Sequence, residues 1–323
     1  MNSTNKAIAY SAQTLNIKNG VGSKFINNFE GRFKAIPAIK EKLQKAIALS
    51  KEKNNKPLII SFASQKGGVG KSTMAVATSQ LLANLGFNVY LVDIDNTESS
   101  HSLLNTRKKN IQEIISNAVN DNVEESEIIK FKESIDPLVD SALVDKEFFT
   151  VNFANEIATG SSYDIIIFDT AGVKDNREEN FDINKLNRAG EVHLILSYLS
   201  NCIVVPMRIT PLDIAMGIRF YYPLSQFIFH LEQMKINVLK TQARILVNAS
   251  ERVGTGVKAL EEFQKSSYKQ FRTIIRRSDK IAFASYLEGV QTAFTTKVAA
   301  QMQESCLEVI DQIADDALVS LEG

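Results

Sequence analysis

The sequence predicts an α/β protein of three layers, in which helices cover both faces of a mainly parallel, twisted β-sheet. Several runs of consecutive apolar residues, typical of buried parallel strands, alternate with stretches of helical periodicity. No two of these runs are joined by a short turn that indicates a hairpin. With 323 residues and 44% hydrophobic side chains, the chain has enough apolar material for a sizeable core.

The elements follow in order along the chain. The expected strands are the apolar runs 58–63, 88–95, 163–169, 201–207 and 242–248, together with a short strand at 148–151. Helices are expected over 74–83, in parts of 106–160, from Thr210 or Asp213 onward, where either residue could cap the helix, and over 295–320.

Charge is distributed unevenly, although Lys+Arg and Asp+Glu both total 37. Residues 1–56 carry eleven basic and three acidic residues, a net of +8, which leaves a net of −8 on residues 57–323. We therefore expect a basic N-terminal arm, 1–56, and a body, 57–323. The arm's charge favours contact with a polyanion such as DNA, a membrane or an acidic partner, and a solvated tail is the alternative.

One helix is expected in the arm, over residues 35–53, because four apolar residues recur at nearly helical spacing between lysines. They are Ile39, Leu43, Ile47 and Leu49. Pro37 would lie in its first turn. Such a helix could dock on the body, bind a partner or touch nucleic acid, and the sequence does not choose among these.

Cysteine usage and hydropathy exclude several classes of protein. Cys202 and Cys306 are the two cysteines, and neither belongs to a C-x-x-C pair, which argues against a disulfide scaffold, a zinc site or an iron–sulfur cluster. Cys202 lies in an apolar run, where we expect a small core residue. The first residues lack the apolar region of a signal peptide, and polar residues interrupt the long apolar stretch 192–207. We expect a soluble protein of a reducing compartment, without stable membrane insertion.

A glycine-rich segment, residues 64–73 (SQKGGVGKST), lies between the first expected strand and a helix that ends near Gly86. This setting is typical of a phosphate-binding loop, because glycines let backbone N–H groups approach phosphate and the helix N-terminus adds positive charge. Lys71 is expected to reach the terminal phosphates and Ser72 to offer its hydroxyl to Mg²⁺. The expected nucleotide-binding residues are Gly67, Gly68, Val69, Gly70, Lys71, Ser72 and Thr73.

Carboxylates end two of the expected strands. Asp93 and Asp95 close the second run, and Asp169 closes the run 163–169. The carboxyl ends of strands face the ligand crevice in open parallel sheets, so these residues are expected near the glycine-rich loop. The spacing of Asp93 and Asp95 places both on one side of a strand, which suits Mg²⁺ or its waters. Capping of the following helix is the alternative.

The pattern K-G-G-x-G-K-[ST], with Lys66 in addition to Lys71, resembles the deviant Walker A motif of the ParA/MinD family of ATPases. The segment D-T-A-G-x-x-D at 169–175 resembles its plasmid-partition branch. The resemblance covers roughly residues 57–320 and implies a P-loop NTPase fold that binds ATP and Mg²⁺. It implies slow, partner-stimulated ATP hydrolysis coupled to formation of a homodimer.

The resemblance also implies roles for single residues. Lys66 would reach the nucleotide of the other subunit, Asp95 would orient the attacking water, and Asp169, with Asp93 beside it, would hold Mg²⁺ through water. Asn248, at the end of an expected strand, matches an adenine-contacting position, although a plain turn residue is the alternative. Residues 96–99 depart from the Pro-Gln-Gly of many members, which bears on the hydrolysis rate.

The function implied by the resemblance is an ATP-driven dimerisation and DNA-binding switch in plasmid or chromosome partition. Its partners would be non-specific DNA and a centromere-binding adaptor protein, and its place the cytoplasm, on the nucleoid. The main alternative is a positioning ATPase for another cargo, such as a conjugation or secretion apparatus or a division regulator. A metabolic relative and a nucleotide-binding scaffold with little turnover also stay open. The expected DNA contacts, with surface ion pairs as the alternative, are Arg252, Arg276, Arg277 and Lys297.

Overall fold

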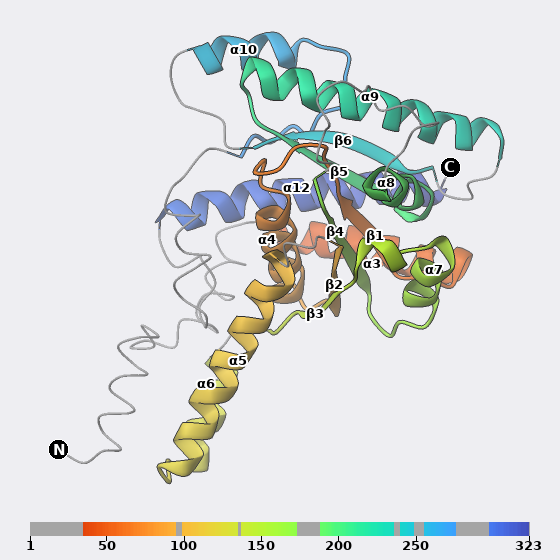
Figure 1. Cartoon of the computed structure of the whole chain (residues 1–323). Helices are drawn as coiled ribbons and strands as arrows, with labels where there is room; N and C mark the ends of the chain where they lie inside the picture. Colours follow the sequence, from red (N-terminus) through yellow and green to blue (C-terminus); the bar gives the residue numbers. More distant parts are fainter. Residues whose placement is uncertain are drawn as a thin grey trace.

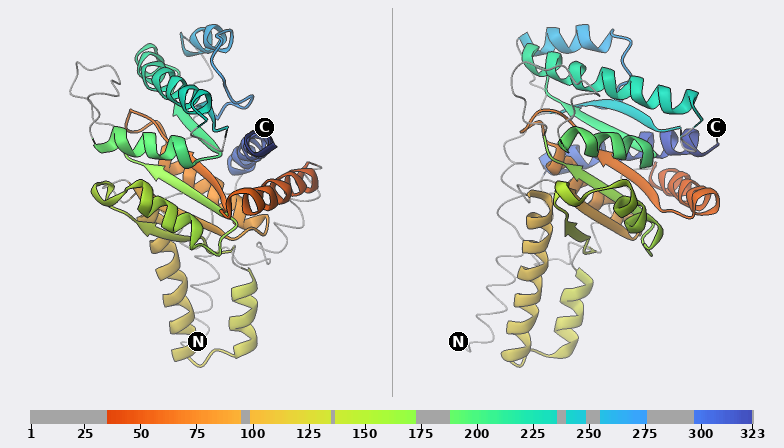
Figure 2. Two further views of the ribbon diagram at one scale, coloured as in Figure 1. Left: turned by 90° about the vertical axis from the view of Figure 1, so that its right-hand side faces the viewer. Right: turned by 45° about the vertical axis from the view of Figure 1, so that its right-hand side comes forward.

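The computed structural model describes residues 35–94, 99–134, 137–172, 188–235, 240–248, 255–275 and 297–322. Within them, a six-stranded parallel sheet has the strand order β3-β2-β4-β1-β5-β6. The strands are β1 (Leu58–Phe62), β2 (Val89–Ile94), β3 (Asp140–Leu143), β4 (Ile165–Thr170), β5 (Cys202–Met207) and β6 (Gln242–Val247). Helices lie on both faces of the sheet, so the predicted three-layer α/β fold is confirmed (Figures 1 and 2).

Side chains of β1 alternate between the two faces, as expected of a strand. Leu58, Ile60 and Phe62 join one buried cluster with α3 (Ile36–Asn54), α4 (Lys71–Asn84) and α12 (Lys297–Glu322). Ile59 points to the opposite face, into a cluster with α7 (Val151–Thr159) and α8 (Arg188–Leu199). The second face continues over β5 and β6 under α9 (Pro211–Gln233) and α10 (Thr255–Gln264). β1 is therefore buried on both sides, which explains its unbroken apolar sequence.

Two helices extend away from this body. α5 (Ser99–Asn120) begins at the sheet and projects outward, and α6 (Glu125–Ser134) returns beside it (Figures 1 and 2). They share a small apolar contact that Ile111 makes with Phe131 and its neighbours. Asp121, Glu124 and Glu125 lie exposed at the far end of the pair.

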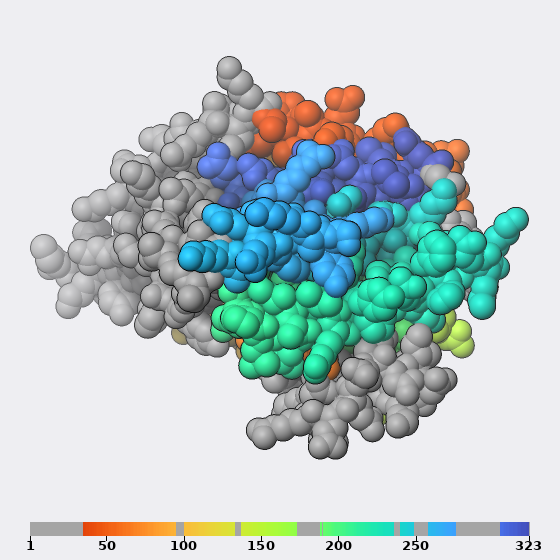
Figure 3. Space-filling view, turned by 90° about the horizontal axis from the view of Figure 1, so that it is seen from above, coloured from red at the N-terminus to blue at the C-terminus, as the bar shows by residue number. Residues whose placement is uncertain are grey.

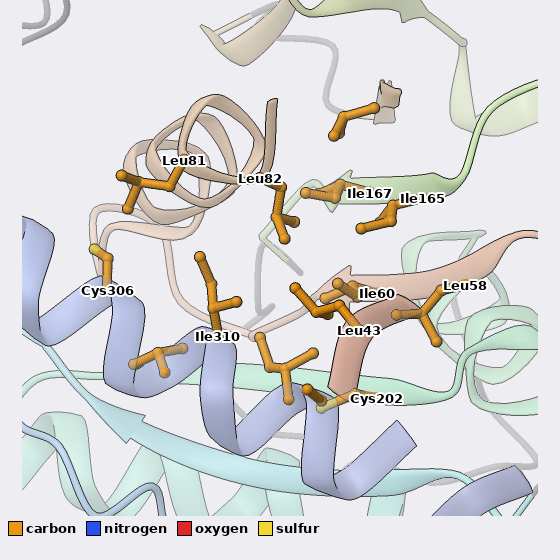
Figure 4. Close-up of a cluster of buried hydrophobic side chains, with 14 of the residues drawn as sticks. Leu43, Leu58, Ile60, Leu81, Leu82, Ile165, Ile167, Cys202, Cys306 and Ile310 are labelled. Carbon is orange, nitrogen blue, oxygen red and sulfur yellow. The ribbon is translucent and has the colours of Figure 1, made fainter. Parts of the chain in front are cut away.

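The basic helix of the N-terminal segment docks on the body. The predicted helix over 35–53 is observed as α3, with Pro37 in its first turn. Ile39, Leu43 and Ile47 are buried on its inner face. Figure 4 shows Leu43 in one cluster with Ile60 of β1 and Ile310 of α12. Figure 3 shows α3 and α12 side by side on the surface.

The lysines of α3 meet acidic side chains of α12. Lys42 Nζ lies 2.8 Å from a carboxylate oxygen of Asp311 and 2.8 Å from one of Asp315. Lys45 Nζ lies 2.6 Å from Glu322 Oε1. Part of the positive charge of the N-terminal segment is thus neutralised by the negative charge of the same chain's last helix.

The prediction of a short strand at 148–151 is wrong. Residues Lys146–Phe148 form a 3₁₀ turn, in which the Asp145 side chain accepts a hydrogen bond from Glu147 N. Thr150 then caps α7 by accepting from Phe153 N. Local capping hydrogen bonds therefore win over the β-propensity of this apolar run.

Two features of the sheet edges differ from a simple strand pattern. β3 was not predicted, because its residues are half-buried or exposed and form no apolar run. At the other edge, residues 269–275 run beside β6, where Phe271 N donates to Ile245 O and Ile275 N donates to Val247 O, both at 2.9 Å. This segment thus extends the edge of the sheet through an isolated bridge between Gln270 and Ile245, and it is not one of the six strands of the sheet.

The two cysteines are free and buried, which confirms the prediction that Cys202 is a core residue. Burial raises the pKa of the Cys306 thiol to about 12, which keeps this thiol protonated and unreactive. No helix in the described part of the chain is long and apolar enough to cross a membrane.

Candidate functional site

The glycine-rich loop joins the end of β1 to the start of α4, as the sequence predicts. Gly68 and Gly70 have φ angles of +73° and +92°, the left-handed region that glycine adopts without strain. Gly70 is the N-cap of α4, and no side chain caps the helix there. No N-cap side chain thus competes with an anion at the first turn of α4, where the helix dipole adds to the attraction of the backbone N–H groups.

Lys71 is the first residue of α4, and its side chain is buried. Its ammonium donates to the carbonyl oxygen of Lys66 at 3.1 Å, and the Ser64 hydroxyl donates to the same oxygen at 3.0 Å. The Lys71 side chain thus folds back over its own loop, where its ammonium could bind a phosphate. Ser72 and Thr73 follow in the first turn of the helix.

Two carboxylates of neighbouring strands lie beside this loop. Asp93 on β2 and Asp169 on β4 are register partners, and both are fully buried. Asp93 Oδ2 accepts hydrogen bonds from Ser100 N at 3.0 Å, Ser100 Oγ at 2.8 Å and His101 N at 2.9 Å. The helix-capping alternative therefore holds for Asp93, because it binds the N-terminus of α5. Its role beside a metal ion stays a prediction.

Asp169 lies in a different environment. Neither of its carboxylate oxygens has a hydrogen-bond partner among the described residues. Burial, and secondly the charge of Asp93, raise its pKa to about 7, although the hydroxyls of Ser72 and Ser100 and the charge of Lys71 act in the opposite direction. A buried carboxyl group without partners is costly for the fold unless a cation or its waters complete it.

This donor set fits Mg²⁺. Magnesium in phosphate-binding enzymes takes few protein ligands and completes its shell with phosphate oxygens and water. The described residues accordingly hold no group of three or more His, Cys, Asp or Glu side chains that could bind a metal ion by themselves. Ser72 and Asp169 would hold the ion, and Asp93 is the neighbour of Asp169 on the adjacent strand.

Asn248 packs directly against the loop. It follows β6, and its side-chain amide donates to the Val69 carbonyl oxygen at 2.7 Å. A Cβ atom on Gly70 would lie 2.0 Å from Asn248 Nδ2, and the φ of +92° would strain any other residue, so the position favours glycine. The structure thus places Asn248 at the loop, and its contact with adenine stays a prediction.

The turn after β4 also meets the loop. A Cβ atom on Gly172 would lie 3.1 Å from Gly67 N and 3.3 Å from Gln65 O, which is tighter than ordinary contact. The segment that follows Asp169 is therefore in direct contact with the phosphate-binding loop. A conformational change in one of the two segments would therefore alter its contacts with the other.

Lys66 forms an ion pair that the sequence does not reveal. Its ammonium pairs with the Asp213 carboxylate in the first turn of α9. The helix at 210–213 was predicted, and Thr210 is its cap, since its hydroxyl accepts from Asp213 N at 3.2 Å. The contact with Lys66, 147 positions away, had no local signal.

His193 was also missed by sequence reasoning. It lies on α8, fully buried, with Nε2 at 3.0 Å from Thr170 Oγ1, beside Asp169. The Thr170 hydroxyl donates to Phe62 O at 2.9 Å, so His193 Nε2 must carry the proton and donate to Thr170. Burial lowers the pKa of His193 to about 3, so the ring is neutral and fixes the end of β4.

Other predicted residues cannot be placed. Asp95, Arg252, Arg276 and Arg277 lie outside the described residues, and Lys297 begins α12 without a described side chain. Their predicted roles stay predictions.

Comparison with known proteins covers part of the chain by sequence and most of it by structure. An AAA domain family model matches residues 58–181. An uncharacterized protein of Methanocaldococcus jannaschii is 33% identical over 132 residues, which are 35% of this chain and 50% of that protein. The sporulation initiation inhibitor protein Soj of Bacillus subtilis is 38% identical over 72 residues, 22% of this chain and 28% of Soj. The matched stretches thus span half or less of these curated relatives.

Among solved structures, a Borrelia burgdorferi B31 protein assigned to plasmid partition, bound to AMPPNP, is similar with a TM-score of 0.50 and 19% identity. The similarity covers 79% of this chain and 98% of that one, and it shows the fold. The AAA domain family model spans residues 66–73, and together with the match to Soj it supports the resemblance to ParA/MinD-type ATPases that these residues indicate. The similar solved structure supports the fold.

Proposed function

We propose that this protein is a Mg²⁺-dependent ATPase in which ATP drives dimerisation and DNA binding during plasmid or chromosome partition. The observation that carries the proposal is the convergence of three features at one edge of the sheet. They are the start of α4, which no side chain caps, the ammonium of Lys71 and the buried carboxyl group of Asp169, whose pKa is raised by burial. The name of one structurally similar protein, which is assigned to plasmid partition and bound to AMPPNP, supports the same function.

Each part of the site then has a chemical role. The loop amides and Lys71 bind the β- and γ-phosphates, because oriented N–H groups and a buried ammonium stabilise anionic oxygens. Ser72 would ligate Mg²⁺ and Asp169 would hold the ion through a water molecule, so that the positive charge would compensate the buried carboxylate. A bound Mg²⁺ supplies charge neutralisation on the transferred phosphoryl group. Asp95 orients the attacking water, and Lys66 stabilises the phosphates of a second subunit.

The output of the cycle is a change of binding state. ATP favours a homodimer, the dimer binds DNA non-specifically, and hydrolysis stimulated by a centromere-binding adaptor releases it. The predicted place of such a protein is the nucleoid in the cytoplasm.

The structure changes where the DNA surface should be sought. Lys42 and Lys45 of α3 already pair with α12, and Lys51 Nζ lies 2.7 Å from Asp164 Oδ1. These lysines are therefore poor candidates for phosphate contacts. Residues 1–34 hold five Lys/Arg and one Asp/Glu, and they and the predicted arginines are the better candidates.

The first experiment is duplex DNA binding with ATP, with ADP and without nucleotide, at several salt concentrations. Asp95→Ala holds the ATP state, and a chain that lacks residues 1–34 tests the basic segment. The deletion must stop before α3, because Leu43 and its neighbours belong to the core. Salt-sensitive binding only with ATP supports the partition switch. Binding that ignores nucleotide, or no binding, would reject it and favour another cargo.

Lys71→Ala tests the nucleotide site itself. Loss of a charge-assisted hydrogen bond to phosphate should weaken ATP binding roughly 10- to 100-fold in calorimetric titration. Lys109→Ala, an exposed lysine on α5, is the control and should bind ATP as the wild type does. Unchanged ATP affinity in Lys71→Ala would contradict the proposed site.

A further inference from the structure

The Lys66–Asp213 ion pair has one fixed and one movable member. Asp213 is held in the first turn of α9, where its backbone N–H donates to Thr210 Oγ1, and its side chain is only 4% exposed. Lys66 lies in the loop, and its side chain is 34% exposed. The helix therefore fixes the carboxylate, and the pair holds the lysine against α9 of its own chain.

The peptide of Lys66 is linked to the phosphate-binding groups. Its carbonyl oxygen accepts from the Lys71 ammonium and from the Ser64 hydroxyl. A phosphate at the start of α4 would compete for Lys71, so nucleotide binding weakens one of the contacts that hold residue 66. The turn at Gly172 touches the same peptide, since a Cβ there would lie 3.3 Å from Lys66 C.

Resting on the proposed function, we propose that Asp213 is a positioning residue that retains Lys66 in its own chain until nucleotide binds. Breaking the pair then frees Lys66 for the phosphates held by a second copy of the chain. Separation leaves the Asp213 carboxylate buried without its cation, which is unfavourable unless another interaction compensates. Anionic phosphates provide that interaction for Lys66, so the pair sets a threshold for nucleotide-driven association and does not block it.

Asp213→Asn tests this threshold, because it keeps the size and hydrogen-bonding capacity of the side chain and removes its charge. At fixed protein concentration, light scattering should show the ATP-dependent dimer at roughly tenfold lower ATP concentration than in the wild type. Glu232→Gln makes the same chemical change near the other end of α9 and should leave the threshold unchanged. Asp213→Ser, which also keeps a short polar side chain, is the second variant if Asp213→Asn does not fold.

A double-mutant cycle on unfolding of the nucleotide-free protein provides the second readout. If the pair exists in solution, the effects of Asp213→Asn and Lys66→Ala will not add. Coupling in the cycle with an unchanged ATP threshold would show that the pair is merely structural, and it would overturn the proposal. Additive effects, or the failure of both Asp213 variants to fold, would also overturn it. Absence of any dimer in the wild type with ATP would instead reject the proposed function, and the cycle would still report on the pair.

Discussion

The α3–α12 face and the carboxyl edge of the sheet differ in how far their charged groups are paired within the chain. On the first, Lys42 reaches two carboxylates, and Arg244 on β6 binds Asp316 of α12 through two hydrogen bonds of 2.5 and 2.6 Å. At the second, Asp169 is buried with no described partner, and no side chain caps α4. In the first region the charged groups find their partners within the chain, and in the second they require a ligand. Such unsatisfied groups lower stability and are expected at functional sites.

The largest effect should come from the completed region. Leu43→Ala removes a fully buried side chain between α3, β1 and α12, and it should lower the free energy of unfolding by about 2–5 kcal/mol. Urea denaturation measures this loss. Val119→Ala, on an exposed position of α5, should change the same quantity by less than about 0.5 kcal/mol. A loss below about 1 kcal/mol for Leu43→Ala would show that α3 is not part of the core.

The incomplete region should behave in the opposite way. The pKa of Asp169 rises from its ordinary value of 3.8 to about 7, so this group lowers the stability of the fold progressively as pH rises through that interval. Asp169→Asn cannot ionise. Its melting temperature, relative to the wild type without nucleotide or Mg²⁺, should therefore increase between pH 5 and pH 8 by about 5 °C. Asp121→Asn, exposed on α5, is the control. A pH-independent difference would mean that Asp169 has a partner in solution.

The smallest effect should come from the surface ion pairs of the completed region. Lys42 and its two partners are partly exposed, so Lys42→Ala should cost only about 0.2–1 kcal/mol in the free energy of unfolding. The cost should shrink further in 1 M salt, because salt screens exposed charges. If Lys42→Ala lowered the free energy of unfolding as much as Leu43→Ala does, α3 would be held on the body mainly by ion pairs and not by apolar burial.

The sequence predicted the five strands that are buried on both faces, because such burial favours runs in which apolar residues predominate. It did not predict β3, whose residues sit half-exposed at the sheet edge. It predicted α3 but not its docking site, since an apolar stripe indicates that a helix face is covered and not what covers it.

The site was predictable where its parts are adjacent in the chain. The loop from Lys66 to Thr73 follows from local pattern, because glycine spacing and the flanking strand and helix decide it. The partner of Lys66 does not, because Asp213 is brought to it by the packing of α9. The difference between Asp93, which caps a helix, and Asp169, which lacks a partner, depends likewise on the three-dimensional arrangement.

The contact between α3 and α12 also means that α3 is synthesised well before one of the helices that cover it. Lys42 and Asp311 are 269 positions apart, so at ribosomal speeds the covering helix follows α3 by some tens of seconds, roughly 10–60 s. During that time the apolar stripe of α3 can meet β1, which follows it directly in the chain, but it lacks the cover of α12. The apolar packing of α3 is therefore completed only after α12 has been made, although α3 is the first described helix.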